Sequence, residues 1–132
     1  MKNTWHLYSE TVFSCNQWLP EDVTGFVITA CNPRGELLLA PTNLLRNNVL
    51  LNELEFAGYR FRAMTGWAPD FSHGEAGWFV FADLAAGKAL AQQFEQNAIY
   101  WVEQGTLNLY PVLLTEHTMT TLGRFRSRVR CV

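Results

Sequence analysis

The sequence predicts an α+β fold, a single ferredoxin-like βαββαβ domain with an antiparallel sheet. Two short apolar segments, 26–31 and 77–82, are typical of strands buried on both faces. Two longer segments carry helix-start signals, and alternating segments complete the order strand, helix, strand, strand, helix, strand. This pattern predicts the core strand order 4-1-3-2, with an extra N-terminal strand and a C-terminal hairpin strand.

The first part of the chain supplies the extra strand and the first helix. Residues 7–13 alternate weakly between apolar and polar and are expected to form the N-terminal strand. A helix is expected over 41–57, because it opens with a proline, and Gly58 suits its end. Thr42 or Asn43 is expected to cap its first N–H groups.

The middle of the chain contains two strands separated by a polar loop. Residues 59–65 alternate, with Arg60 and Arg62 on one side, which indicates an edge strand with a wet face. Residues 66–76 are rich in Gly, Pro, Asp and Ser and are therefore expected to form a loop. The apolar segment 77–82 follows as the second central strand.

The second helix and a hairpin follow. Asp83 is expected to cap a helix over 84–95, whose apolar residues recur at helical spacing. Residues 98–103 and 106–112 then form two strands, joined by the two-residue turn Gln104-Gly105, which is typical of a β-hairpin.

Composition sets limits on the class of protein. The chain has 132 residues, 48% of them apolar and 17% charged, with a net charge of −2, so one domain with an ample core is expected. Residues 1–114 hold six basic against eleven acidic side chains, whereas 115–132 hold four arginines against one glutamate. We therefore expect an α+β domain over 1–114, with 26–112 as its core, followed by a basic tail or edge strand.

The three cysteines indicate where the protein is found. Cys15, Cys31 and Cys131 are odd in number and widely spaced, which supports neither a disulfide framework nor a zinc site. A reducing cytoplasm is therefore expected. No apolar segment approaches the roughly 20 residues of a membrane helix, so no membrane contact is expected.

The predicted topology brings polar side chains to one end of the sheet. There the first core strand ends, the first helix begins, the 66–76 loop turns and the second helix ends. The residues expected at this end are Asn32, Arg34, Asn43, Asp70, His73, Glu75, Gln96 and Asn97. A helix N-terminus beside Arg34 could hold a carboxylate or phosphate, and the amides could bind a polar ligand. Alternatively, the amides only satisfy turns and helix ends.

Several of these residues carry a family resemblance. The segment 26–35 (FVITACNPRG) and the segment 94–100 (FEQNAIY), with Asn43 and Glu75 between them, resemble a bacterial family catalogued as domain of unknown function 3293. The resemblance extends from about residue 26 to 112. It implies a soluble cytoplasmic protein and no particular activity.

Two kinds of chemistry could operate at this end. Cys31 could be a nucleophile with His73 as base and Glu75 or Asp70 orienting it, or it could be an inert buried thiol. His73 with Asp70 and Glu75 could ligate a metal, although a single loop histidine is typical of solvated loops. Phosphate-loop, dinucleotide and zinc-protease motifs are absent from the sequence, so neither cofactor nor metal is expected.

The C-terminal segment alternates strictly, with four arginines on one side. Three interpretations remain open for it: a solvated tail, a strand paired on a sheet edge, or a nucleic-acid contact. The arginines concerned are Arg124, Arg126, Arg128 and Arg130.

The sequence alone assigns no function. We expect a non-enzymatic binding module that takes a small polar or anionic ligand, or a protein partner. The expected binding residues are Asn32, Arg34, Asn43, Glu75, Gln96 and Asn97. The alternatives are a small hydrolase- or transferase-like enzyme that uses Cys31 or the pair His73 and Glu75, and a nucleic-acid accessory protein that uses the C-terminal arginines.

Overall fold

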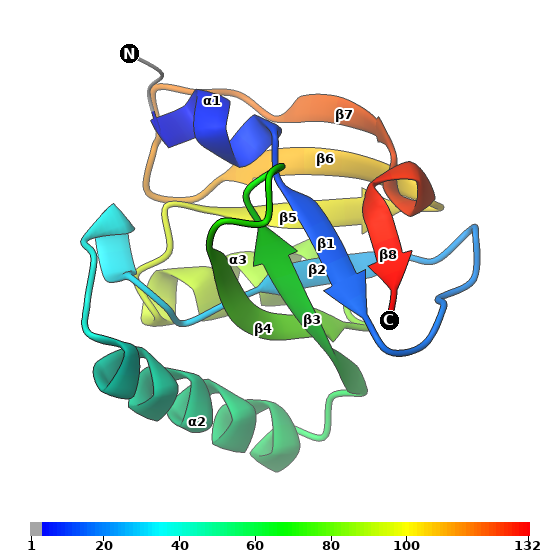
Figure 1. The fold of residues 1–132 in the computed structure, drawn as a ribbon. Helices are drawn as coiled ribbons and strands as arrows, with labels where there is room; N and C mark the ends of the chain where they lie inside the picture. Colours follow the sequence, from blue (N-terminus) through cyan, green and yellow to red (C-terminus); the bar gives the residue numbers. More distant parts are fainter. Residues whose placement is uncertain (1–3) are drawn as a thin grey trace.

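A computed structural model describes residues 4–132 as one α+β domain, built on a strongly curled, half-barrel sheet with three α-helices (Figure 1). The helices are α1 (Thr4–Ser9), α2 (Ala40–Phe56) and α3 (Leu84–Gln93). The strands are β1 (Val12–Cys15), β2 (Gly25–Ile28), β3 (Phe61–Trp67), β4 (Gly74–Val80), β5 (Ala98–Glu103), β6 (Thr106–Pro111), β7 (Thr120–Arg124) and β8 (Val129–Cys131). Within these residues, no helix is both long and apolar enough to cross a membrane.

The eight strands lie in the order β7-β6-β5-β2-β4-β3-β1-β8. All neighbours are antiparallel except β1 and β8, which are parallel. The α+β class is therefore confirmed, and the central strands follow the order β5-β2-β4-β3. A four-stranded ferredoxin-like sheet is not what forms, because two further strands extend and curl the sheet on each side.

The curled sheet has an apolar core on each face. Phe26 and Ile28 of β2 pack with Leu54 of α2 and the apolar side of α3, whereas Val27 packs in a second core with Phe13 of β1. Successive strand residues point to opposite faces, so both faces of β2 must be apolar. This explains the unbroken apolar segment. In Figure 1, α2 lies at the bottom and α1 at the top left, on opposite sides of the sheet.

The extra N-terminal strand is present but starts later than predicted. Thr4–Ser9 form the short helix α1, and of the predicted segment 7–13 only residues 12 and 13 belong to the strand, β1. β1 adds to β3 in the antiparallel register Val12↔Trp67. The strand predicted at 59–65 is consequently an internal strand, and the arginines in it do not mark an edge.

The helix ends differ in how they are capped. Asp83 caps α3 as predicted, since its side chain accepts a hydrogen bond from Ala86 N at 2.9 Å. The predicted caps of α2 are wrong, because Leu39 occupies the N-cap position without a side-chain bond. Asn43, one turn into the helix, instead bonds to the preceding loop. The turn at Gln104-Gly105 is confirmed, and both residues have positive φ, as the tight hairpin turn requires.

The C-terminal segment is part of the sheet. β7 pairs with β6 at one edge and β8 pairs with β1 at the other, with a 3-10 turn, Phe125–Arg128, between them. Phe125 is buried in the second core, which breaks the strict alternation predicted for a single strand. Of the three interpretations, the structure has the paired strand.

Candidate functional site

The structure has a groove of about 670 Å³ on the inner side of the curled sheet. α1, the loop after β2, the β3–β4 hairpin and the start of β5 surround it. Trp67 and Leu37 contribute apolar surface. The polar side chains that line the groove include Tyr8, Glu10, Thr11, Asn32, His73, Glu75, Gln96, Asn97 and Tyr100. The volume lies within the roughly 300–1,000 Å³ typical of small-molecule sites.

Asn32 organises the loop at the groove. Its backbone is left-handed, with φ 49°, a conformation that asparagine tolerates well. Its Oδ1 accepts hydrogen bonds from Leu38 N and from Asn43 Nδ2, both at 2.9 Å, and Asn43 Oδ1 accepts from its backbone N–H. Its remaining donor, Nδ2, points to Glu75 Oε1 at 3.5 Å. The two asparagines therefore hold a loop, and only Nδ2 of Asn32 reaches towards the groove.

Glu75 is the carboxylate at the centre of the groove. It lies on β4 directly opposite Gly66 of β3, and both residues line the groove. Burial raises the pKa of Glu75, and the hydrogen bond from Asn32 and the charge of His73 only partly offset this. The carboxylate is thus poorly solvated and incompletely compensated by its protein neighbours.

Two tyrosines attach α1 to the sheet at the groove. Asn97 Nδ2 donates to the Tyr8 hydroxyl at 3.1 Å, and the buried Tyr100 hydroxyl donates to the backbone oxygen of Tyr8 at 2.7 Å. Tyr100 also lies 2.8 Å from Thr11 Oγ1. Burial raises the pKa of both tyrosines, so both hydroxyls stay protonated at neutral pH. Sequence reasoning missed this pair, since Tyr8 was expected on a strand.

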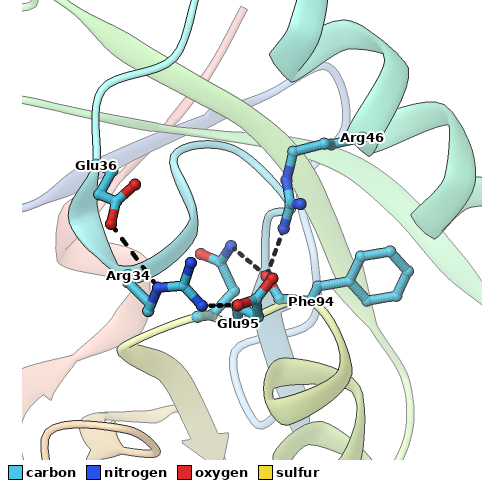
Figure 2. Close-up of polar contacts among 6 residues, drawn as sticks. Arg34, Glu36, Arg46, Phe94 and Glu95 are labelled. Carbon is cyan, nitrogen blue, oxygen red and sulfur yellow. Dashed lines mark hydrogen bonds and ion pairs between the residues drawn. The ribbon is translucent and has the colours of Figure 1, made fainter.

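Arg34 does not face the groove as a free cation. Its guanidinium forms ion pairs with Glu95 and, at 3.9 Å, with Glu36 (Figure 2). Its backbone N–H donates to Glu95 O at 2.7 Å, which joins the loop to the end of α3. Two carboxylates therefore compensate Arg34, and the reason for expecting an anion at this end is lost.

Gln96 and a residue not predicted, Arg46, hold the same junction. Gln96 is buried, and its Nε2 donates to Cys31 O at 3.1 Å and to Phe94 O at 3.2 Å. Arg46 of α2 donates to Ala30 O at 2.7 Å. It also donates to Phe94 O at 2.7 Å, as Figure 2 shows. The predicted convergence of the loop after β2 with the end of α3 is therefore observed, but these side chains satisfy backbone carbonyls.

Asn47 is the most consequential residue that sequence reasoning missed. It is buried on α2, accepts from Ala30 N at 2.9 Å, and donates to Ala76 O at 2.9 Å and to Cys31 Sγ at 3.2 Å. The sequence does contain a signal for this role. Asn47 is a polar residue three positions before Leu50, so it lies on the side of the helix that packs on the sheet.

Cys31, the nucleophile of the enzyme alternative, has no hydrogen bond to a histidine among residues 4–132. Burial raises the pKa of the Cys31 thiol, whose polar contacts are with Thr29, Asn47 and Ala76. His73 is exposed on the β3–β4 hairpin and lies 3.0 Å from Ser72 Oγ. Asp70 accepts from the backbone of Ser72. The triad is therefore not assembled, and residues 4–132 hold no cluster of three or more His, Cys, Asp or Glu suited to a metal.

Three of the C-terminal arginines have structural partners. Arg126 pairs with Glu21 at 2.8 Å, Arg128 donates to Ser9 O at 2.6 Å, and Arg130 lies over the ring of Phe71. These contacts spread the arginines over different neighbours instead of one basic face. Nucleic-acid binding through them stays a prediction.

Comparison with known proteins gives one match. Residues 28–99, just over half of the chain, match the sequence model of the family described as protein of unknown function DUF3293. The chain belongs to this family. Neither the curated proteins nor the solved structures contain a match.

The part that matches the DUF3293 model contains most of the polar site. Asn32, Glu75 and Asn97 lie within it, whereas Tyr8 and Tyr100 lie outside. Of the six predicted binding residues, four line the groove: Asn32, Glu75, Gln96 and Asn97. Arg34 and Asn43 hold the loop behind it.

The pKa of Glu75 makes stability depend on pH. A carboxyl group whose pKa is raised on folding stabilises the fold fully below its unfolded pKa, and this contribution is lost as the pH rises through the folded value. Between mildly acidic and neutral pH, Glu75→Gln should therefore lose less free energy of unfolding than the wild type does. Urea unfolding at a series of pH values measures this difference. Parallel pH profiles for the two proteins would contradict it.

Proposed function

We propose that this DUF3293 protein is a non-enzymatic binding module, whose groove holds a small molecule with a positively charged, hydrogen-bond-donating end and an apolar body. The observation that carries the proposal is the half-buried carboxylate of Glu75 inside the groove, with its raised pKa. Desolvation disfavours this charge when the groove is empty. A bound cation beside Glu75 would replace the stabilisation by water that the carboxylate loses on burial.

The lining of the groove supports a cation over an anion. Two carboxylates, Glu10 and Glu75, line it, and among the lining residues of 4–132 there is neither lysine nor arginine. Arg34, on which the expectation of an anionic ligand rested, is paired with Glu36 and Glu95. The polar or anionic ligand predicted from the sequence is therefore replaced in our proposal by a cationic one.

The rest of the groove suits an apolar body. The indole of Trp67 is held by a hydrogen bond from its Nε1 to Ser14 Oγ at 2.8 Å, and it lies over Gly74, where a Cβ atom would come within 2.5 Å of the ring. Its position is thus fixed by both neighbours. A flat or aliphatic group could pack on Trp67 and Leu37 while its charged end meets Glu75.

Three probes of nearly equal shape test the proposal: 2-phenylethylamine, 2-phenylethanol and phenylacetate. We expect the amine to bind best and the carboxylate worst, with the amine at least about 10-fold tighter than the alcohol, or about 1.4 kcal/mol. Titrations followed by protein NMR chemical shifts at pH 7.5 measure the dissociation constants. The shifted signals should include Gly66 and Trp67.

The matched variants are Glu75→Gln in the groove and Glu36→Gln outside it. Glu75→Gln should remove the preference for the amine and leave binding of the alcohol unchanged, whereas Glu36→Gln should alter neither. Equal binding of amine and carboxylate, or an amine preference that survives Glu75→Gln, would overturn the cationic assignment.

A second function is favoured by the same raised pKa. A carboxyl group with a pKa shifted towards neutrality can act as a general base, so Glu75 could abstract a proton from a bound substrate. In that case Glu75→Gln should abolish conversion of the substrate but retain its binding. Mass spectrometry of metabolites incubated with wild-type and variant protein separates this enzyme from the binding module.

We further propose a cytoplasmic location in a bacterium and a relation of the central sheet to ferredoxin-like domains. The three free thiols support the first, and the antiparallel order β5-β2-β4-β3 with α2 and α3 packed against one apolar core supports the second. Fractionation of the native host tests the location.

A further inference from the structure

Two cysteines far apart in the sequence lie side by side at one edge of the sheet. In the parallel pair β1–β8, Cys15 is the register partner of Cys131. Directly paired residues of neighbouring strands project to the same face, and neighbouring strands lie ~4.8 Å apart, within the Cα separation that a disulfide spans. Contact with the Cys131 thiol also contributes to the raised pKa of Cys15, after the larger effect of burial.

The third cysteine is placed differently. Cys31 lies in the loop after β2, where its thiol contacts Asn47 and the Ala76 carbonyl. All three thiols are free in the structure. The juxtaposition of Cys15 and Cys131 is therefore specific to this pair.

The strand that carries Cys131 also holds one wall of the groove. β8 has only three residues and lies at the sheet edge, and its attachment includes the bond from Val132 N to Cys15 O at 2.8 Å. Arg128, just before β8, donates to Ser9 O at 2.6 Å and to Thr11 O at 3.3 Å. Ser9 and Thr11 belong to the segment that links α1 to β1, and Thr11 lines the groove. Short edge strands open easily. Opening of β8 would therefore weaken the contacts of Arg128 with the segment that forms this wall of the groove.

We propose that Cys15 and Cys131 form a reversible disulfide under oxidising conditions, which fastens β8 to β1 and holds Arg128 on the segment between α1 and β1. This proposal stands independently of what the groove binds.

The oxidant that balances this step is a peroxide. The thiolate of Cys131, which is only half-buried, attacks one oxygen of hydrogen peroxide, becomes a sulfenic acid and releases hydroxide, which takes up a proton to give water. The thiolate of the buried Cys15 then attacks the sulfenic sulfur, forms the S–S bond and displaces a second hydroxide, again protonated to water. Two thiols and one peroxide thus give one disulfide and two waters. A dithiol reductant reverses the reaction by exchange.

The test treats the full chain with an equimolar amount of hydrogen peroxide and then blocks the remaining thiols after unfolding. We expect the intact mass before blocking to fall by about 2 Da, the two hydrogen atoms lost on disulfide formation. One thiol, Cys31, should remain to be blocked, and a proteolytic fragment should join the peptides of Cys15 and Cys131. Cys31→Ser should behave like the wild type, and Cys131→Ser should not lose this mass.

Two further measurements test the consequence. The oxidised protein should melt about 5 °C or more above the reduced protein, because a cross-link over so long a loop restricts the unfolded chain, and dithiothreitol should reverse the shift. Hydrogen exchange of residues 11–15 should slow at least about 10-fold on oxidation. Stable sulfinic acid on Cys131 without cross-linking, a cross-link that uses Cys31, or unchanged exchange of 11–15 would each overturn the proposal.

Discussion

Gly77→Val is expected to abolish folding. A Cβ atom on Gly77 would lie 2.3 Å from Ile28 O, 3.1 Å from Ile28 C and 3.2 Å from Thr29 Cα. All three are backbone atoms, which cannot rotate away as a side chain could, and the close-packed interior leaves no room for a shift. We expect a loss of at least about 4 kcal/mol, most of the stability of a typical domain.

The physical reason lies in the crossing of two elements. β2 ends at Ile28, and the chain then passes directly over Gly77 of β4 on its way to the Asn32 loop. A side chain at this point would push apart the two central strands. Because β2 and β4 are flanked on both sides by other strands, the damage would spread through the sheet.

Circular dichroism during thermal unfolding measures the effect, with Ala76→Val as the matched control. Ala76 is the neighbouring residue on β4, and its side chain is exposed, so the introduction of valine there should leave the melting temperature within a few degrees of wild type. A Gly77→Val protein that melts cooperatively near the wild-type temperature would show the strand crossing to be wrong.

Asn47→Ala is expected to cost about 2 kcal/mol of unfolding free energy. The substitution removes bonds to Ala30 N, Ala76 O and Cys31 Sγ. Ala76 O keeps the hydrogen bond from Thr29 Oγ1 at 2.6 Å, whereas the buried Ala30 N loses its side-chain acceptor. A buried donor that loses its partner costs about 1–3 kcal/mol, which accounts for the expected value.

The same substitution should also weaken the groove. Asn47 fastens residues 30–31 to β4 at Ala76, and the next residue, Asn32, is the one that bonds Glu75. With this anchor gone, the loop should hold Asn32 less firmly, and binding of 2-phenylethylamine should weaken several-fold in protein that is still folded.

Urea unfolding of Asn47→Ala beside Asn48→Ala gives the comparison. Asn48 is exposed on the same helix, so its replacement has the same propensity effect without the buried bonds and should change stability by less than about 0.5 kcal/mol. If the two variants were equally stable, the buried network at Asn47 would have no energetic role.

The groove and the structural network are closely joined in this molecule. Asn43, Gln96 and Arg46 are polar groups at one end of the sheet, yet each of them satisfies a loop or a helix end. Glu75 lies where this network ends, and among residues 4–132 its carboxylate has a single hydrogen-bond donor, Asn32 Nδ2, at 3.5 Å. The candidate site therefore lies at the edge of a framework of paired polar groups.

Much of the secondary structure follows from local pattern. The apolar segments at 26–31 and 77–82 mark β2 and β4, because a strand buried on both faces has no polar positions. Asp83 predicts the start of α3 and Gln104-Gly105 the hairpin, since capping and turn geometry involve only a few neighbouring residues. The central strand order then brings the Asn32 loop to Gln96, as the sequence indicates.

Other features depend on distant partners. Residues 7–13 alternate weakly enough for either state, and in the structure they are divided between the end of α1 and the start of β1. Asn97 and Tyr100, about ninety positions away, hold Tyr8 in the helical part. The arginines of the C-terminus look like one basic face in the sequence. The 3-10 turn Phe125–Arg128 interrupts that face, with Phe125 buried in the core, and the arginines contact separate partners.

The sequence by itself determines the α+β class, the central strands and the meeting of four polar segments at one end of the sheet, because periodicity, caps and turns are local. Only the tertiary structure decides that Arg34 is neutralised and that Glu75 is left half-buried in a groove. Charge and hydrogen-bond partners across 40 or more residues set those outcomes. A local sequence pattern identifies the polar groups, but it does not show which distant residues become their partners.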